Sequence, residues 1–451
     1  MGVVSSLEDK LVKKISSVFS EGFIQEQAIK SKFIQRSSKI TAVKFLDLLI
    51  YNSSQNQCLS LNQLSVEASS GHQVDISKQG LDQRMNSHAV KFMHRLLQKQ
   101  MTNQISESLE VGLMDQFNRV RIKDSTKFDV HRQLQEWLPG FGGSASAASA
   151  CIQYEFDLKS GSVMDLSLTP GNRPDSKDAQ EKYTDIGQGD LIIRDLGYFS
   201  LDVLSEIQQA KAYFISRLNF KTTVYEQIDE VLVELDFGKL YRYMEQTGIT
   251  KMEKQVLIGK EEKMPVRLII ERMPDQIYEQ RLRKAKTYNY KKGYQTSTGY
   301  SERARFNLFV TNTREDILSS HAVPLFYKVR WQVELIFKVW KSTFGIQATR
   351  KMKIERFLCL LYSKLLLIMV NWEIILVYRH SIYSAKGKLL SLDKCFKTLK
   401  SNEGKFREIL KRKGPAIEEL VQWTGKIFES KHWLEKRKNK LCYEELISVI
   451  F

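Results

Sequence analysis

One carboxylate lies among cations on an otherwise mostly apolar segment, YKVRWQVELIFKVWKS at residues 327–342. In an α-helix, with about 100° between successive residues, the charged side chains and one tyrosine share an arc of roughly 80°. The residues of this arc are Tyr327, Arg330, Glu334, Lys338 and Lys341. An ordinary surface helix shows the reverse, a narrow apolar stripe on a polar cylinder. The pattern therefore predicts a largely buried helix whose single polar edge serves a charged site.

Two aspartates occupy positions comparable to that of Glu334. Asp124 ends a predicted strand in RVRIKDSTKF, and Asp195 ends another in DLIIRD. Because strand ends of one α/β sheet can meet at a common edge, the three acids can converge. Buried carboxylates need cations or metal ions, and oxygen ligands without His or Cys select hard ions such as Mg²⁺. We therefore predict that Asp124, Asp195 and Glu334 are catalytic and bind Mg²⁺, for which Mn²⁺ could substitute.

Such a site would carry out phosphoryl transfer. Two ions about 3.5–4 Å apart would activate water or a 3′-hydroxyl and stabilise the leaving oxygen. Arg330 and Lys341, beside Glu334, would hold substrate phosphates. An alternative remains open for the aspartates, because acids at strand ends commonly cap helices or form turns. Other acids that compete for the aspartate roles are Asp129, Asp157, Asp165 and Asp190.

The overall charge favours a polyanionic partner. The chain has 451 residues, a net charge of +17 and a pI near 9.4, so nucleic acid is expected first and an anionic membrane second. A merely basic soluble protein is the alternative. The five cysteines form no CxxC pair, which argues against a zinc site or a disulfide framework and fits a reducing cytoplasm.

The segment 357–378, FLCLLYSKLLLIMVNWEIILVY, is long enough to span a bilayer. Its Lys364 and Glu373 would each cost about 2.5–3.5 kcal/mol near the centre of a membrane. We therefore predict a buried helix of a large domain and no membrane association.

Residues 1–115 contain no proline and show helical periodicity, which predicts a helical N-terminal region. Residues 59–71 and 76–100 resemble two helices joined by a polar turn, compatible with a DNA-binding helix-turn-helix. Four polar side chains of the second helix could read bases or simply face solvent: Gln79, Gln83, Arg84 and Asn86.

From residue 117 the pattern changes to short apolar runs bounded by turn residues. We predict a strand to Asp124, a hairpin at 151–170, a strand at 190–195, a helix at 201–210 and a strand at 212–220. Antiparallel strands followed by strands that alternate with helices predict an α/β fold with a mixed sheet.

Residues 221–275 contain further strand runs and predict a β-rich insertion. Residues 280–306 are dense in cations and tyrosines, which suits a phosphate backbone with occasional base stacking but also fits a solvated charge run. A strand at 306–313 and the helix entered through Pro324 follow. Helices are expected to the end, with basic patches at 411–413 and 436–440.

The helix residues Tyr327, Arg330, Glu334 and Lys341 spell Y-x2-R-x3-E-x6-K. This pattern resembles the signature of cut-and-paste DDE-type transposases of the "IS four" family of insertion sequences. RIKDSTKF and RDLGYFS resemble the two aspartate motifs of that family, and Arg217 in ISRL matches its arginine after the next strand. The resemblance covers about residues 60–380.

The resemblance implies roles for individual residues. The catalytic, metal-binding triad would be Asp124, Asp195 and Glu334. The DNA-binding residues would be Tyr327, Arg330, Lys341, Lys338 and Arg217. It also implies a nicked strand whose 3′-hydroxyl forms a hairpin end, joining to target DNA, and a synaptic homodimer that holds two terminal inverted repeats. A prokaryotic cytoplasmic enzyme associated with the nucleoid is expected.

We therefore expect an α/β protein with an RNase H-like core. The expected regions are a helical DNA-binding region (1–115), the first core part (116–220), a β-rich insertion with its basic segment (221–304), the second core part (305–380) and a helical C-terminal region (381–451). Two alternatives remain: a non-catalytic DNA-binding derivative that acts as an inhibitor or regulator, and an RNase H-like nuclease.

Overall fold

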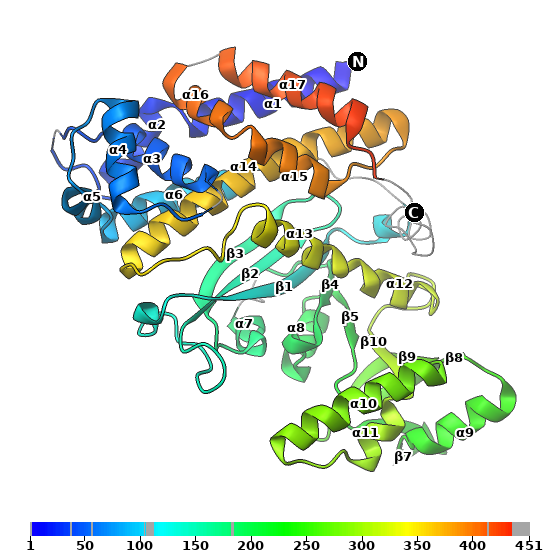
Figure 1. The fold of residues 1–451 in the computed structure, drawn as a ribbon. Coiled ribbons are helices and arrows are strands. Elements are labelled where there is room, and N and C mark those ends of the chain that lie inside the picture. Colours follow the sequence, from blue (N-terminus) through cyan, green and yellow to red (C-terminus); the bar gives the residue numbers. More distant parts are fainter. Residues whose placement is uncertain are drawn as a thin grey trace. The chain divides into compact units, whose positions relative to one another are not determined.

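The computed structural model describes residues 2–36, 38–55, 57–102, 104, 112–181, 185–412 and 415–434 (Figure 1). These residues form two compact units. Unit 1 draws on the described residues within 2–104, 125–173 and 332–434, and unit 2 on those within 112–124 and 174–331. Strand β1 (Val120–Asp129) contributes its first half to unit 2 and its second half to unit 1.

The described strands form a ten-stranded mixed sheet in the order β3-β2-β1-β4-β5-β10-β9-β8-β6-β7. The other strands are β2 (Ser149–Asp157), β3 (Val163–Pro170), β4 (Leu191–Arg194), β5 (Tyr213–Arg217), β6 (Val224–Ile228), β7 (Val231–Glu234), β8 (Lys251–Ile258), β9 (Met264–Arg272) and β10 (Phe306–Thr311). Strand β4 is parallel to β1 and β5, whereas β2 and β3 form the predicted antiparallel hairpin. This order confirms the predicted α/β fold with a mixed sheet.

Unit 2 also contains helices. These are η1 (Gly112–Gln116), α7 (Asp175–Glu181), η3 (Leu196–Tyr198), α8 (Leu201–Gln209), α9 (Phe237–Thr247), α10 (Asp275–Lys292), α11 (Thr298–Arg303) and α12 (Ala322–Val329). Of these, α8 and α12 contact the parallel strand β5. The first half of β1 is buried although it carries Arg121 and Lys123, because acids of unit 2 pair with both side chains. Its charged face therefore belongs to the interior of this unit.

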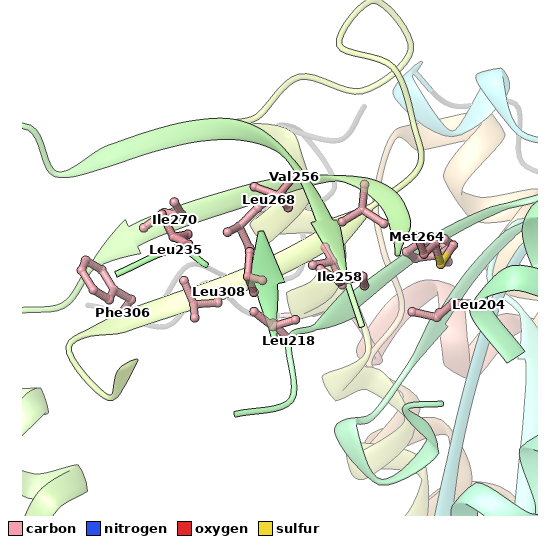
Figure 2. Packing of buried hydrophobic residues seen from close by; sticks show 14 of the residues in the cluster. Leu204, Leu218, Leu235, Val256, Ile258, Met264, Leu268, Ile270, Phe306 and Leu308 are labelled. Atoms are coloured by element: carbon pink, nitrogen blue, oxygen red, sulfur yellow. The ribbon is translucent and has the colours of Figure 1, made fainter. Parts of the chain in front are cut away.

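The β-rich insertion extends the sheet of unit 2. Strand β10 pairs with β5 on one side and with β9 on the other, and β8, β6 and β7 follow. Figure 2 shows that buried side chains of β8, β9 and β10 pack together with Leu204 of α8 and Leu218. The same cluster includes Ile192 of β4 and Phe214 of β5. The insertion thus shares one hydrophobic core with the parallel strands, and a helix, α9, interrupts its predicted strands.

Unit 1 is mainly helical. Its helices are α1 (Gly2–Val18), α2 (Glu21–Lys30), α3 (Ala42–Ser54), α4 (Leu61–His72), α5 (Lys78–Arg84), α6 (Ser87–Thr102), η2 (Arg132–Leu134), α13 (Trp331–Ser342), α14 (Ile354–Lys386), α15 (Leu392–Ser401), α16 (Gly404–Arg412) and α17 (Pro415–Lys431), of which α13 begins at the last residue of unit 2. Helix α14 contacts α1, α3, α6, α15 and α17 and forms the centre of this unit.

Helix α14 is long and apolar enough to cross a membrane, but 94% of its most apolar 18-residue stretch is buried inside the protein. The two charged residues that would be costly in a membrane, Lys364 and Glu373, both have hydrogen-bond partners within the protein. The Lys364 ammonium donates to the Gly345 carbonyl at 2.7 Å, and the Glu373 carboxylate accepts hydrogen bonds from Lys14 and from Gln100. The predicted buried helix is therefore confirmed, and it extends from Ile354 to Lys386.

The predicted helix at 76–100 is two helices, α5 and α6, which corrects the sequence expectation. Ser77 caps α5, and the Asn86 side chain accepts from the backbone of His88 and Ala89 at the start of α6. Arg84 donates to Ser38 and Ile40. Of the four candidate base-reading side chains, only Gln79 and Gln83 are exposed.

Four cysteines are free and buried, and Cys442 lies outside the described residues. The basic patches at 411–413 and 436–440 also lie outside the described side chains.

Candidate active site

The register of two parallel strands brings Asp124 and Asp195 together. Val120 of β1 is paired with Leu191 of β4, and Lys123 with Arg194. The residues that follow this last pair are Asp124 and Asp195. Strand β4 ends at Arg194, whereas β1 continues to Asp129. The expectation that the first strand ends near Asp124 was therefore wrong. Asp124 lies inside β1, at the point where its partner strand β4 ends and β2 remains its neighbour.

The Asp195 carboxylate is not used as a helix cap. Asp195 occupies the N-cap position of the short helix η3, but its side chain accepts no capping hydrogen bond. This observation removes the capping alternative for Asp195.

The competing acids have other surroundings. The Asp190 carboxylate pairs with Arg119 at 2.5 Å before β4 begins, and the Asp157 carboxylate accepts from the backbone of Lys159 and Ser160 in the hairpin turn. Asp129 is exposed at the end of β1, and Asp165 is half-buried on β3.

One guanidinium approaches both aspartates. Nη1 of Arg330 donates to Oδ2 of Asp124 at 2.5 Å, and its Nε lies 3.6 Å from Oδ1 of Asp195. Two neighbouring carboxylates repel each other, and a cation between them offsets that repulsion. Sequence reasoning placed Arg330 at DNA phosphates and did not foresee these contacts with the aspartates.

Tyr327 lies in the same neighbourhood. Its ring meets that of Phe309 edge-on at 5.4 Å between centroids, and the guanidinium of Arg330 lies 5.9 Å from its centroid. Burial raises the pKa of Tyr327 to about 12, and the Asp195 carboxylate adds to the rise. The charge of Arg217, at the end of β5, opposes it. At neutral pH the hydroxyl of Tyr327 therefore keeps its proton and can donate a hydrogen bond.

The single helix predicted over 327–342 is divided. Helix α12 ends at Val329, Arg330 forms a turn in which its N–H donates to the Tyr327 carbonyl at 3.2 Å, and α13 begins at Trp331. Trp331 was expected on the buried apolar surface, but it is 50% exposed.

Helix α13 carries Glu334, Lys338 and Lys341, which belong to unit 1. Its apolar side packs on β2, where the ring of Trp340 meets that of Tyr154 at 5.0 Å. Glu334 and Lys338 are exposed, while the half-buried Lys341 donates from Nζ to the Lys127 carbonyl at 2.9 Å. Burial lowers the pKa of Lys341. The polar edge of this helix thus presents the Glu334 carboxylate and the Lys338 ammonium to solvent, while the Lys341 ammonium is hydrogen-bonded to the backbone.

Comparison with known proteins identifies the chain. Residues 115–370 match the family described as "Transposase DDE domain". The chain belongs to this family. The transposase for insertion sequence element IS231B of Bacillus thuringiensis subsp. berliner is 30% identical over 383 residues, which cover 81% of this chain and 80% of the relative. The transposase for IS1151 of Clostridium perfringens is 30% identical over 411 residues, 86% of this chain and 85% of the relative.

A solved piggyBac transposase in a synaptic complex with hairpin DNA aligns with 96% of this chain and 87% of its own, at a TM-score of 0.49 and 9% identity. At this level the similarity says nothing about function. The family match and the two named relatives show that the protein is a DDE-type insertion-sequence transposase, an enzyme of DNA cleavage and strand transfer. The "IS four" group expected from its sequence fits this family.

DDE transposases generally use divalent metal ions. Among the described residues of this transposase, no cluster of three or more His, Cys, Asp or Glu side chains is assembled to hold a metal. Asp124 and Asp195 nevertheless offer carboxylate oxygens on either side of the Arg330 guanidinium. Mg²⁺ is commonly held by one or two carboxylates together with water and substrate phosphates, so this pair of ligands fits such an ion.

Sequence reasoning missed Asp175 of α7. A Cβ atom at Gly197 would lie 3.4 Å from Oδ2 of Asp175 and 4.0 Å from Oδ2 of Asp195, so both carboxylates border the same glycine. The preceding Pro174, typical of a helix start, was the available signal, but it indicated a helix and not a site.

Proposed function

We propose that this transposase cleaves DNA at the ends of its insertion sequence and joins the freed ends to target DNA through a site formed by Asp124, Asp195 and Glu334. One observation carries the proposal: adjacent parallel strands place Asp124 and Asp195 at matching register, and one guanidinium contacts both. Two carboxylates at the ends of neighbouring parallel strands offer the one or two oxygen ligands by which proteins commonly bind Mg²⁺ together with substrate phosphates.

The carboxylates would hold Mg²⁺, in two ions, with Mn²⁺ as a substitute. When bound, such ions lower the pKa of the attacking water or 3′-hydroxyl and stabilise the leaving oxygen of an in-line displacement. Asp124 and Asp195 supply oxygen ligands from the sheet, and Glu334 supplies one from α13.

The cations and Tyr327 would orient the DNA. Arg330 can exchange its carboxylate partners for a phosphate, to which its planar guanidinium can donate two parallel hydrogen bonds. Tyr327 remains protonated at neutral pH and can donate to a phosphate oxygen. Lys338, Lys341 and Arg217 would contribute positive charge to the same backbone.

The family resemblance extends the proposal to the reaction sequence. The 3′-hydroxyl freed by the first nick would attack the opposite strand and form a hairpin, and two protomers would hold the two terminal inverted repeats together. The enzyme would act in the cytoplasm on nucleoid DNA, without a membrane partner.

A nicking assay tests the catalytic proposal. The full-length protein is incubated with a labelled duplex that carries an end of its element, in Mg²⁺ or EDTA. We expect Mg²⁺-dependent nicking at the element boundary, and loss of nicking by at least a hundredfold in Asp124→Asn, Asp195→Asn and Glu334→Gln with end binding retained.

Asp129→Asn is the matched control, because Asp129 is an exposed aspartate on the same strand as Asp124. It should nick like the wild type. Cleavage retained in one of the three variants overturns the role of that residue. Specific binding without any cleavage by the wild type would instead identify a non-catalytic DNA-binding derivative.

A further inference from the structure

Helix α10 is labelled in Figure 1. None of its 18 residues is buried. A helix that is polar on all sides usually depends on many ion pairs between neighbouring turns or on contacts at one side. No ion pair within α10 is found among the described residues. Some of its side chains therefore bind the helix to the rest of unit 2, and the others face solvent.

Three arginines of this region hold the fold together. Arg281 of α10 donates to the carbonyls of Ala304 and Phe306 and to Oδ1 of Asn307. The guanidinium of Arg305 lies between the rings of Tyr241 and Tyr278, at 4.1 and 4.2 Å from their centroids. Arg303 donates to the carbonyls of Phe220 and Thr222. These cations are satisfied by their own unit.

The other cations of α10 are exposed and have no acidic partner in the described part of the chain. They are Arg283, Lys284, Lys286, Lys291 and Lys292. The sequence contains no Asp or Glu between Glu279 and Glu302, so no neighbour along the chain neutralises them. Their charge is available to an external anion.

The positions of these residues separate them from the attached side of the helix. The half-buried residues of α10 are Tyr278, Arg281, Leu282, Ala285 and Asn289. At about 100° per residue these occupy one side, while Arg283, Lys286, Tyr290 and Lys291 span an arc of roughly 140° on the other. The outward face is thus cationic and carries an aromatic ring.

Three tyrosines accompany the free cations. Tyr288, Tyr290 and Tyr294 are 64%, 87% and 70% exposed. An anionic membrane would require an apolar face on a basic helix, and α10 has none. Lysines and arginines interleaved with exposed aromatic rings instead suit nucleic acid, because phosphates pair with the cations and unstacked bases lie on the rings.

We propose that α10 and the following turn to Tyr294 form a DNA-binding surface that contacts phosphates regardless of base sequence, with Tyr290 and Tyr294 available to unpaired bases. This proposal rests on the proposed function, since it gives the transposase a second contact with DNA apart from its catalytic carboxylates. The surface binds DNA in the absence of divalent ions.

Binding to a random-sequence duplex without an element end tests the surface. Fluorescence anisotropy is measured in EDTA from 50 to 200 mM salt for the wild type and for Arg283→Gln/Lys286→Gln/Lys291→Gln. We expect the variant to bind at least tenfold more weakly at low salt. Its slope of log affinity against log salt should fall by about 0.9 for each DNA phosphate that the variant no longer neutralises.

Lys211→Gln/Lys260→Gln/Lys263→Gln is the matched control. It removes the same charge from exposed lysines elsewhere in unit 2 and should lower the affinity far less. Equal affinity and slope for the two triple variants would overturn the proposal, because general charge would then explain binding. Loss of binding to phosphatidylserine vesicles with unchanged DNA binding would also overturn it.

The tyrosines are tested on single-stranded oligothymidine. Tyr290→Ala/Tyr294→Ala should weaken binding roughly five- to a hundredfold, because stacking of a base on an aromatic ring contributes about 1–3 kcal/mol. Tyr290→Phe/Tyr294→Phe should bind like the wild type. Unchanged binding by the alanine variant contradicts the stacking role. None of these measurements involves cleavage, so failure of the nicking assay and failure of this surface are separate results.

Discussion

At the scale of residues, the charge between Asp124 and Asp195 is the feature with the clearest chemical consequence. The guanidinium of Arg330 contacts both carboxylates, and the side chains of Arg330 and Asp124 are mostly shielded from water. A divalent ion that binds the same oxygens has to displace this ion pair. In the proposed function, Arg330 would therefore couple metal binding to DNA binding, because the released guanidinium would pair with another anion.

Replacement of Arg330 should affect metal binding and DNA binding in opposite directions. We expect Arg330→Gln to bind Mn²⁺ without DNA roughly ten- to 150-fold more tightly, since a charge-assisted hydrogen bond that contributes about 1.5–3 kcal/mol no longer competes. Electron paramagnetic resonance of free Mn²⁺ measures this affinity. The same variant should bind end DNA more weakly. Arg314→Gln is the control, because Arg314 is exposed and pairs with Asp316. Equal or weaker Mn²⁺ binding by Arg330→Gln would contradict the competition.

At the scale of elements, β1 buries apolar side chains on one face and charged side chains on the other. Val120 and Ile122 share the face of Asp124, while Arg121 and Lys123 lie on the other face with acids as partners. Lys123 and Asp178 of α7 form an ion pair at 2.6 Å, and neither side chain is exposed to solvent. This pair ties α7 to the strand that carries Asp124.

Breaking the buried pair should be costly. We expect Asp178→Asn to lower the free energy of unfolding by about 3–5 kcal/mol, because the buried Lys123 ammonium would lose the carboxylate that lies 2.6 Å from it. Urea denaturation followed by circular dichroism measures the change. Lys123→Met/Asp178→Leu should recover part of the loss, and Lys177→Gln, at an exposed neighbour, should stay within about 0.5 kcal/mol of the wild type. An Asp178→Asn protein as stable as the wild type would rule out this role.

The elements also show what the sequence could reveal. Strand β4, the hairpin of β2 and β3 and helix α14 were predictable, because their apolar runs and turn residues are local signals. The extent of β1 depends on β2 as a neighbour, which is a long-range pairing. The break at Arg330 involves neither Gly nor Pro, and the contacts of Arg330 with two aspartates arise only in the folded chain. The candidate carboxylates were therefore visible in the sequence, whereas their shared contact with Arg330 was not.

At the scale of the whole molecule, the positive charges that make up the net charge of +17 differ in whether they can bind an external anion. Several buried or half-buried cations are paired within the protein, whereas those on the outer face of α10 are free in the described chain. In unit 1, a further group of charges lies in the interior. Burial lowers the pKa of Lys364 to about 8 and raises the pKa of Glu403 to about 7. Glu403 accepts from Lys400 at 2.9 Å, which only partly offsets burial.

These two groups predict how stability depends on pH. Glu403 holds its proton in the folded protein above its ordinary pKa of 4.5, so unfolding releases a proton and stability falls between pH 4.5 and about 7. Lys364 loses its proton in the folded protein below its ordinary pKa of 10.5, so stability rises between about pH 8 and 10.5. Each contribution is on the order of 3 kcal/mol. Denaturant titrations across this range should show a minimum between pH 7 and 8. Glu403→Gln should flatten the acidic limb and Lys364→Met the alkaline limb, while unchanged limbs in both variants would show that other groups govern the profile.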